Sequence, residues 1–392
     1  MQTINNPSTP YFLVKEKIIA ENVNGFRDAL DQHGNNSTLA YSIKTNTLPF
    51  LIQWMHSQHV MAEVVSDEEY ELARICGYDP SEIVFNGPIK SEEYLKQAIQ
   101  GGAIVNLDSK KDLEFLVNNN PPFKGNIGIR INPSPDIFQS EDIGYQEDGF
   151  RFGFSEENGC LAAAFDQFEK IYNHRRVGLH LHVNSITRSV AVYKAIAKYA
   201  RFLVEKYNLC PPFIDIGGGF FGGVPGKPTP VEYLSVIREE FEKCERLSKV
   251  RLVVEPGSAM IGSAVELHTS VLDVKDTARA RIVTTDGSRI HIDPLWIKSR
   301  YTYRIESNGK PHSKQIICGY TCMDHDRIMI IDNEPELSYG DRIVYEKVGN
   351  YTTTLGGSFI CTPPAVYVEN DDGIRLIRKK MSVSEYYQME TV

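Results

Sequence analysis

The sequence predicts a two-domain chain in which a parallel (β/α)8 barrel is followed by a smaller domain of β-strands. Short runs of β-branched and apolar residues alternate with helix-like segments through the first two thirds of the chain, and this alternation is typical of a parallel sheet. It occurs eight times, which matches a closed barrel. After about residue 265 only short strands and turns follow. We therefore place the barrel at residues 21–264 and the β domain at residues 1–20 and 265–392.

The eight predicted barrel strands are parallel, so each must be joined to the next by a crossover, normally a helix. The strands are expected at 37–44, 61–66, 82–87, 103–108, 126–131, 177–183, 213–218 and 251–256. The clearest helical spacing lies in 67–77, 91–101, 189–207 and 231–245, with Ser91 as an N-cap and Gly77 as a C-cap. An open doubly wound sheet is the alternative, and the lack of an early nucleotide fingerprint makes it less favoured.

The fifth barrel unit is longer than the others. Residues 132–155 form a loop rich in Pro, Asp, Ser and Gly, and a helix is expected at 156–173. Long loops of this kind often cover active sites.

The second domain is predicted from short strands separated by turn sequences such as 307–310 and 371–373. The strands are expected at 281–285, 315–319, 327–331, 342–347, 365–368 and 374–377. Residues 10–14 could add a strand to this domain, and 382–389 could form one or two helical turns.

Composition excludes several classes of protein. The 392 residues include 42 Lys and Arg against 51 Asp and Glu, a formal charge of -9, which argues against a nucleic-acid binder or a polybasic membrane-surface protein. No run approaches the roughly 18 apolar residues of a membrane span, and the first residues lack a secretory signal. The 7 cysteines are scattered without a Cys-x-x-Cys pair, so we expect neither a disulfide framework nor a zinc site, and a cytoplasmic protein.

The C-terminal ends of barrel strands carry the chemistry of this fold, so they select candidate residues. These ends hold Lys44, Glu63, Arg130, His182 to Ser185, Gly217 to Gly219, and Glu255 with Gly257. Each alone has an ordinary explanation: most lysines are solvated, glycines form turns, carboxylates pair with cations, and single histidines pack in cores.

Together, these groups predict a phosphorylated aldehyde cofactor, pyridoxal 5'-phosphate. A lysine desolvated in a barrel mouth can lose its proton and form a Schiff base. Glycine N–H groups can approach a phosphate closely, and a carboxylate keeps the pyridine nitrogen protonated, so that the ring withdraws electrons.

The motifs also resemble a known family, the fold-type III pyridoxal-phosphate decarboxylases that include diaminopimelate and ornithine decarboxylases. The resemblance runs from about Pro10 to about Tyr367. The matching segments are 41–46 (YSIKTN), 178–185 (GLHLHVNS), 215–220 (DIGGGF), 255–257 (EPG), 319–322 (GYTC) with Asp326, and 349–352 (GNYT). It implies a barrel and β domain of the alanine racemase and ornithine decarboxylase type.

The resemblance implies roles for these residues. Lys44 forms the Schiff base, His182 stacks on the ring and Glu255 pairs with the ring nitrogen. Cys322, from the partner in a head-to-tail homodimer, protonates the carbanion after carbon dioxide leaves. The other expected cofactor contacts are Glu63, Arg130, Ser185, Gly217, Gly218, Gly219, Gly257 and Tyr351. The expected activity is that of a carboxy-lyase.

Departures from the family pattern concern the substrate. Ser258 stands where family members commonly have an arginine, and Asn184 stands where they commonly have a glycine. Met323 replaces the acidic residue that binds the distal amino group of the substrate. Asp293 aligns with the arginine that binds a distal carboxylate of the substrate. We therefore expect a modified or conjugated amino acid rather than free diaminopimelate, as in siderophore or other specialised biosynthesis. The expected substrate contacts are Met323, Asp324, Asp326, Asp293 and Asp286.

Two other functions remain open. A racemase or epimerase on the same fold could use Tyr301, Tyr303 or Tyr320 as its base, and a silent regulatory homologue would have no activity. No metal is expected, because no third ligand is evident beside His180 and His182 in the sequence.

Overall fold

The structure is a computed structural model that describes residues 7–32, 37–119 and 126–390. It divides into two compact units, Asn22–Met260 (the barrel unit) and Met1–Glu21 with Ile261–Val392 (the β unit). The first six residues, on which the expectation of no secretory signal rests, lie outside the described part. None of the described helices has the length and apolar character needed to cross a bilayer.

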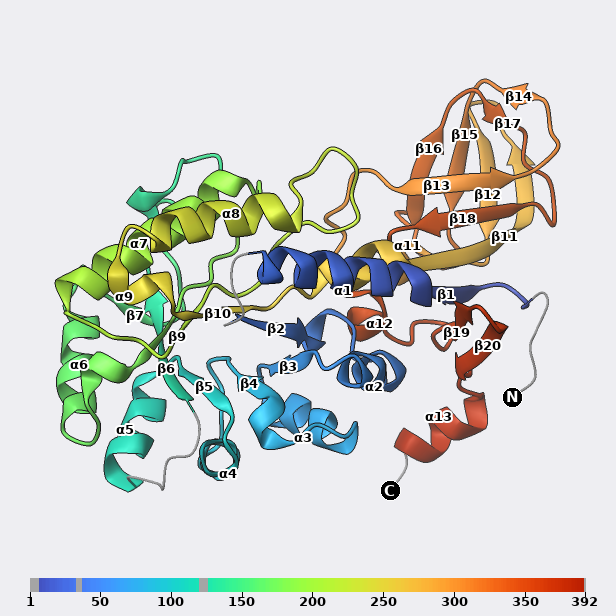
Figure 1. The fold of residues 1–392 in the computed structure, drawn as a ribbon. Coiled ribbons are helices and arrows are strands. Elements are labelled where there is room, and N and C mark those ends of the chain that lie inside the picture. Colours follow the sequence, from blue (N-terminus) through green and yellow to red (C-terminus); the bar gives the residue numbers. More distant parts are fainter. Residues whose placement is uncertain (1–6, 33–36, 120–125, 391–392) are drawn as a thin grey trace. The chain divides into compact units, whose positions relative to one another are not determined.

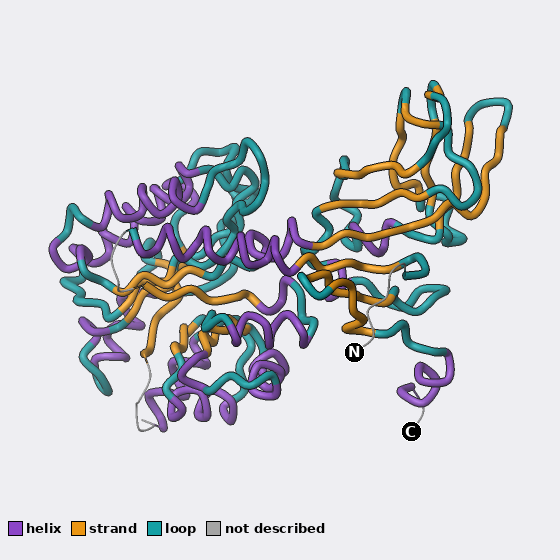
Figure 2. Tube along the Cα trace, turned by 45° about the vertical axis from the view of Figure 1, so that its right-hand side comes forward, coloured by secondary structure: helices purple, strands orange, loops and turns teal. Residues whose placement is uncertain are grey.

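The barrel unit contains a closed parallel sheet of eight strands, which confirms the predicted (β/α)8 barrel (Figures 1 and 2). The strand order is β5-β4-β3-β2-β10-β9-β8-β6, and pairing of β5 with β6 closes the barrel. The strands are β2 (Ser37–Ser42), β3 (Met61–Val64), β4 (Ile83–Phe85), β5 (Ile104–Leu107), β6 (Asn126–Asn132), β8 (Gly178–His180), β9 (Phe213–Asp215) and β10 (Arg251–Val254). Each lies within, or differs by one residue from, a predicted strand.

Helices surround the barrel strands on their outer side (Figure 1). The helices of the barrel unit are α1 (Glu16–Asp31), which begins in the β unit, α2 (Pro49–Ser57), α3 (Asp67–Ile75), α4 (Glu92–Gly101), α5 (Lys110–Asn119), α6 (Cys160–Glu169), α7 (Val190–Lys206), α8 (Pro230–Phe241), α9 (Glu245–Ser248) and α10 (Ser258–Ile261), which follows β10 and ends in the β unit. The Ser91 hydroxyl accepts a bond from the N–H of Tyr94, as an N-cap does.

Two helix predictions were wrong in their bounds. The helix expected at 156–173 starts only at Cys160, because the preceding chain forms β7 (Phe154–Ser155) against β6 and turns at Gly159. The helix expected at 231–245 ends at Phe241, and the extended backbone of Cys244 separates it from α9.

The barrel interior contains the Phe213 ring, which packs with Ala40, Val84, Ile104 and Val253. Two glycines on neighbouring strands make room for it. A Cβ at Gly178 would lie 2.4 Å from the ring, and a Cβ at Gly128 would lie 2.9 Å from it. These strands therefore require glycine where they face Phe213.

Gly178→Ala should lower the free energy of unfolding by about 1–3 kcal/mol, because the new methyl overpacks the core. Gly144→Ala is the matched control, since its Cβ would meet no atom closer than 3.7 Å. Urea unfolding of both variants measures the difference. Equal stability of the two variants would contradict this packing.

The β unit is a mostly antiparallel sheet with short helices. Its nine-stranded sheet has the path β16-β15-β12-β11-β1-β19-β20, and β18 joins β13 to β11. The strands are β1 (Tyr11–Lys15), β11 (Val265–Asp276), β12 (Arg281–Thr285), β13 (Thr302–Glu306), β15 (Gln315–Cys318), β16 (Arg327–Ile331), β18 (Arg342–Glu346), β19 (Ala365–Asn370) and β20 (Gly373–Arg378). A separate pair joins β14 (Pro311–His312) to β17 (Glu334–Pro335), and the helices are α11 (Arg289–Ile292), α12 (Thr352–Leu355) and α13 (Val383–Glu390).

The N-terminal segment adds a strand to this sheet, as the sequence suggested. β1 pairs antiparallel with β11 and parallel with β19. The 12-residue strand β11 was missed, because charged residues interrupt its apolar pattern where its second half becomes exposed.

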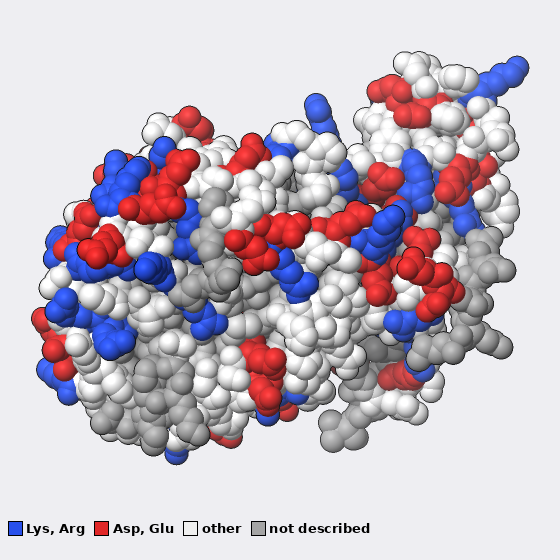
Figure 3. Space-filling view, in the orientation of Figure 1, with Lys and Arg blue, Asp and Glu red and all other residues white. Residues whose placement is uncertain are grey.

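Charged side chains of both signs are interspersed on the face shown in Figure 3. No continuous basic stripe crosses this face, in keeping with the formal charge of -9. All 7 cysteines are free.

Candidate active site

Lys44 and Glu63 lie together at the C-terminal ends of adjacent strands. Lys44 belongs to the short helical turn η1 (Ile43–Thr45) directly after β2, and its Nζ is 2.6 Å from Glu63 Oε2 and 2.7 Å from Ser42 Oγ. The Ser42 hydroxyl donates to the same carboxylate oxygen. The amine and the carboxylate chosen from the sequence therefore form an ion pair in which Glu63 is buried and the Lys44 side chain is 39% exposed.

This pair changes the expected protonation of Lys44. Burial lowers the pKa of the ammonium, but the carboxylates of Glu63 and Glu255 outweigh burial, so the pKa of Lys44 is raised overall. The sequence argument considered only desolvation, which favours a neutral amine. In this structure the amine is held protonated until the Glu63 charge is compensated.

Two asparagines link the carboxylates inside the barrel mouth. Asn86, after β4, donates through Nδ2 to Glu63 Oε1 (3.1 Å) and Glu255 Oε1 (2.7 Å). Asn106, on β5, donates through Nδ2 to Asn86 Oδ1 and Asp215 Oδ2, both at 2.8 Å. Residues after or within five strands thus form one hydrogen-bonded network.

Glu255, Asp215 and His180 meet at the centre of the barrel. One ligating atom of each lies within 4.8 Å of the others, and all three are buried. Burial, then the nearby charges of Asp215 and Glu63, raise the pKa of Glu255 well above its usual range, and burial also raises the pKa of Asp215. The expectation of no metal was made without this cluster, whose members lie on or directly after three different strands.

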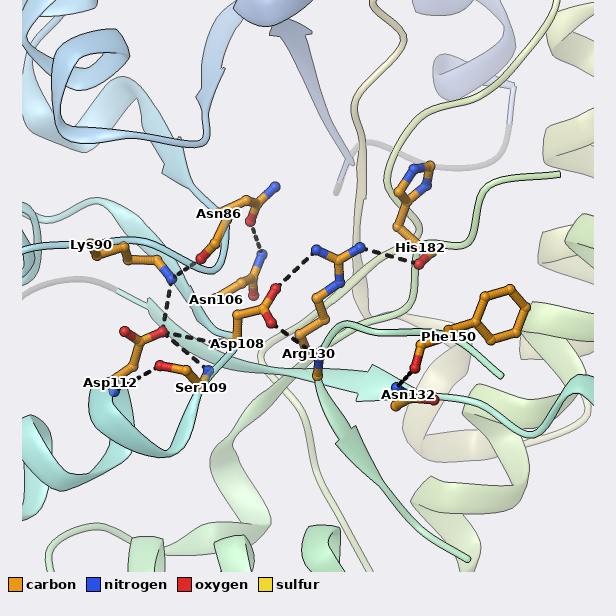
Figure 4. Close-up of polar contacts among 12 residues, drawn as sticks. Asn86, Lys90, Asn106, Asp108, Ser109, Asp112, Arg130, Asn132, Phe150 and His182 are labelled. Carbon is orange, nitrogen blue, oxygen red and sulfur yellow. Dashed lines mark hydrogen bonds and ion pairs between the residues drawn. The ribbon is translucent and has the colours of Figure 1, made fainter. Parts of the chain in front are cut away.

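Arg130 on β6 is held by Asp108 rather than by a site carboxylate (Figure 4). Its Nη1 is 3.0 Å from Asp108 Oδ2, its Nη2 donates to the carbonyl of His182, and its guanidinium lies 4.5 Å from the centre of the Phe152 ring. The other oxygen of Asp108 accepts the backbone N–H of Gly153 at 3.0 Å. Asp108 therefore joins Arg130 to the end of the long loop.

His182 is a neutral ring at this mouth. Burial and the positive charges of Arg130 and Lys44 lower the pKa of its imidazole to about 3. A neutral imidazole can stack on an aromatic ring without adding a charge. Beside it lies a cavity of about 350 Å³, lined by Arg130 and His182 and by the loop residues Tyr145, Phe150, Arg151 and Phe152.

The glycine loop after β9 packs closely against its own chain and has backbone conformations that favour glycine. Gly217 and Gly219 have φ values of +70° and +87°, and a Cβ at Gly218 would lie 2.5 Å from the Glu255 carbonyl. Gly257 packs as tightly, since its Cβ would lie 2.1 Å from Thr45 Oγ1. The Ser185 hydroxyl donates to the Asp142 carbonyl and accepts the N–H of Arg188.

The barrel-mouth residues fit pyridoxal 5'-phosphate. They provide an amine for the aldehyde, a glycine turn for the phosphate, a neutral ring for stacking and a carboxyl group for the ring nitrogen. Within the described residues, the two buried ring nitrogens of His180 have no hydrogen-bond partner, and they lie at the same polar centre.

In the β unit, Cys322 is exposed in the loop after β15, next to half-buried Met323 and exposed Asp324. Buried Asp326 supports this loop by accepting bonds from Thr321 Oγ1 (2.7 Å) and Ser288 Oγ (2.9 Å). Tyr351 stands just before α12 with a left-handed backbone.

The other two acidic candidates of the β unit are also engaged internally. Asp293 is buried and accepts bonds from the Arg289 guanidinium, the Tyr301 hydroxyl and the N–H of Lys298. Asp286 accepts the N–H of Ser270 at 2.8 Å.

Comparison with known proteins identifies the family of this chain. The family model described as "Pyridoxal-dependent decarboxylase, pyridoxal binding domain" matches residues 16–262. The chain belongs to the pyridoxal-dependent decarboxylases. A probable chloroplastic diaminopimelate decarboxylase of Oryza sativa subsp. japonica is 26% identical and aligns over 96% of this chain and 79% of its own length. A diaminopimelate decarboxylase of Archaeoglobus fulgidus is 24% identical, over 99% and 94% respectively.

Solved structures share the fold of this decarboxylase. A diaminopimelate decarboxylase from M. jannaschii matches with a TM-score of 0.86 at 20% identity, over 98% of this chain and 92% of that one. An arginine decarboxylase of Paramecium bursaria Chlorella virus matches with a TM-score of 0.77 at 21% identity, over 92% and 96% respectively. The family, the fold and the cofactor predicted from sequence are confirmed: the protein is a pyridoxal-phosphate-dependent amino-acid decarboxylase, a carboxy-lyase. This favours the main interpretation over a racemase or a silent homologue.

Several polar residues of the decarboxylase site were missed by the sequence argument. Asn86, Asn106 and Asp108 were not considered, whereas His180 and Asp215 lie in the matching segments 178–185 and 215–220 but were given no role. All lie on or next to the C-terminal ends of barrel strands, so the rule that selected Lys44 could have selected them. It was applied only to groups with an obvious role toward a cofactor.

Glu63→Gln should lower the pKa of Lys44, because a contacting carboxylate raises a lysine pKa by about one to three units. The pH at which the cofactor attaches covalently to Lys44 should fall by the same amount. The neutral amine is the reactive form, so attachment speeds up as pH rises, and the variant should react faster at neutral pH. Stopped-flow absorbance of the cofactor-free protein mixed with pyridoxal phosphate measures the rate. Slower attachment by the variant at every pH would contradict this account.

Proposed function

We propose that this decarboxylase removes the α-carboxylate of an amino acid whose distal end is modified or conjugated. The observation that carries the proposal is Met323, half-buried directly after Cys322, where the family grips a distal amino group with an acidic residue. Asp286, Asp293 and Asp326 already accept hydrogen bonds within the β unit. Of the acidic candidates only Asp324 is exposed. A free distal ammonium would therefore have few partners, and a buried unpaired charge costs several kcal/mol.

The size and lining of the cavity beside His182 support a bulky substrate. Three aromatic side chains of the loop face about 350 Å³ of space, and Arg151 adds a cation. Such a pocket suits an acyl or similar group that carries an anionic or polar end. Biosynthesis of siderophores or other specialised metabolites is the setting that we propose for such a substrate.

Each residue at the mouth has one task in the proposed mechanism. Lys44 binds the cofactor through its amine, and Glu63 Oε2, at 2.6 Å, is the nearest acceptor for the proton that the amine must lose. Glu255 would pair with the ring nitrogen of the cofactor, His182 would contact its ring, and the N–H groups of the glycine loop would bind its phosphate. Bound pyridoxal phosphate supplies an electron sink for the pair left when carbon dioxide departs.

Cys322 is the proposed proton donor to the α-carbon. An exposed thiol on a loop supported by Asp326 can reach a substrate in a neighbouring subunit and act as a general acid. We propose a homodimer in which each subunit supplies Cys322 and Tyr351 to its partner's barrel. The 7 free cysteines, 3 of them exposed, support a reducing compartment such as the cytoplasm.

Diaminopimelate is the second candidate substrate. The relatives named above support it, since most are diaminopimelate decarboxylases, although at 24–26% identity. Met323 and the engaged Asp293 count against it, because an ion pair at the far end of the substrate would be missing.

A substrate panel in heavy water distinguishes the two candidates. The holoenzyme is incubated with diaminopimelate, ornithine, lysine and their N-acylated forms, and products are followed by mass spectrometry. We expect loss of carbon dioxide with gain of one deuterium for a modified compound, at least tenfold more efficiently than for the free amino acids, a difference of about 1.4 kcal/mol. High efficiency with free diaminopimelate would replace the modified-substrate proposal, and deuterium gain without loss of carbon dioxide would indicate a racemase.

The shared active site is tested by mixing two inactive variants. Lys44→Ala and Cys322→Ala each lose activity, but a mixed dimer has one site with both wild-type residues, because a two-fold dimer pairs each barrel with the partner's loop. Mixing should restore up to about a quarter of the wild-type activity. If subunit exchange is demonstrated and activity is not restored, Lys44 and Cys322 of one subunit belong to the same site, and the shared site is contradicted.

A further inference from the structure

The centre of the barrel contains more carboxyl groups than cations to pair with them. Glu63, Asp215 and Glu255 are all buried there. Of these three carboxyl groups, Lys44 forms an ion pair with Glu63 and with neither of the others in the described residues. The two other cations nearby are engaged elsewhere, Arg130 with Asp108 and Lys90 with Asp112. Asp215 and Glu255 are therefore left as a pair.

The partners of this pair are uncharged. Asp215 accepts from the Asn106 amide and the N–H of Gly217, both at 2.8 Å, and Glu255 accepts from the Asn86 amide at 2.7 Å. Within the described residues neither forms an ion pair, and an oxygen of each lies within 4.8 Å of the other and of a His180 ring nitrogen. Two carboxylates so close in a buried site cannot both ionise at neutral pH without a large penalty.

We propose that Asp215 and Glu255 share one proton and present a single negative charge, so that Asp215 is a positioning residue for Glu255. This rests on the proposed function in one respect, that Glu255 faces the ring nitrogen of the cofactor. A protonated ring nitrogen carries one positive charge, and the pair then matches it with one negative charge. When Glu255 is ionised and pairs with the protonated ring nitrogen, Asp215 holds the proton.

The surrounding charges agree with a proton on the carboxyl pair rather than on the histidine. Burial and the charge of Arg130 lower the pKa of His180 well below its usual range, so its ring is neutral. Burial raises the pKa of both carboxyl groups, and the interaction between the two raises the pKa of Glu255 further while it lowers the pKa of Asp215, so that the proton lies on Glu255 in the cofactor-free protein. The charged and titratable groups facing the cluster are Lys44, Glu63, Lys90, Arg130, His180 and His182.

Infrared spectroscopy of the cofactor-free protein at about pH 6 tests the proposal, because only a protonated carboxyl group gives the acid carbonyl band. Asp215→Asn and Glu255→Gln should each remove the same band, since the remaining partner then ionises, and the double variant should remove no more. Glu69→Gln is the control: burial raises the pKa of Glu69 to about 7, so this variant should lose a band of its own and keep that of the pair. Two independent bands for Asp215 and Glu255, or none, would overturn the shared proton.

The pH dependence of stability gives a second readout. Between the pKa of an unfolded carboxyl group, about 4, and the raised pKa of the folded pair, the native state holds one proton that the unfolded chain has lost. Stability therefore falls as pH rises through this window. Either single variant should flatten the slope by one proton, so one foldable variant is enough. An unchanged slope in a folded variant would overturn the proposal.

These measurements separate this inference from the proposed function. They use neither cofactor nor substrate, so their failure leaves the decarboxylase mechanism standing. Cofactor affinity tests the ring-nitrogen contact: Glu255→Gln should weaken binding at least tenfold, whereas Asp215→Asn, which mimics the protonated acid, should weaken it less than threefold. An equal loss in both variants would overturn the positioning role of Asp215.

Discussion

The site depends on how the barrel holds three buried carboxyl groups beside a single reactive amine. Burying charge is costly unless each group is paired or hydrogen-bonded. Here Lys44 offsets Glu63, while the side-chain amides of Asn86 and Asn106 bridge to Asp215 and Glu255. Such a network can exist only where eight parallel strands bring their C-terminal ends together, because its members come from strands that are far apart in the sequence. The fold and the chemistry of the mouth are thus the same arrangement.

Asp108 fixes Arg130 and the end of the long loop of the decarboxylase. One of its oxygens binds Arg130 (Figure 4), and the other binds the backbone of Gly153, where the long loop returns to the barrel. Arg130 in turn contacts the His182 carbonyl and the Phe152 ring. The loop that lines the cavity and the segment that carries His182 are therefore held by one ion pair.

The sequence predicted the barrel because each strand–helix unit carries its own local signal, and it predicted Lys44, His182 and Glu255 because barrel chemistry lies at strand ends. It predicted β1 in the second sheet, but it missed β11, whose pattern is broken by charged residues in its exposed half. The site residues that it missed, such as Asn86 and Asn106, gain their role only from neighbours across the barrel. The raised pKa of Lys44 could not be predicted either, because the contact with Glu63 depends on the pairing of β2 with β3.

The central claim is that Lys44 is the amine that binds pyridoxal phosphate at this mouth. The most direct measurement is borohydride reduction of the holoenzyme, followed by proteolysis and mass mapping of the pyridoxyl label. The account predicts one labelled lysine per chain, Lys44, and no label in Lys44→Ala. A label on Lys90 would contradict it; Lys90 is buried in the same barrel, with its ammonium paired to Asp112. An undiminished label in the variant would contradict it as well.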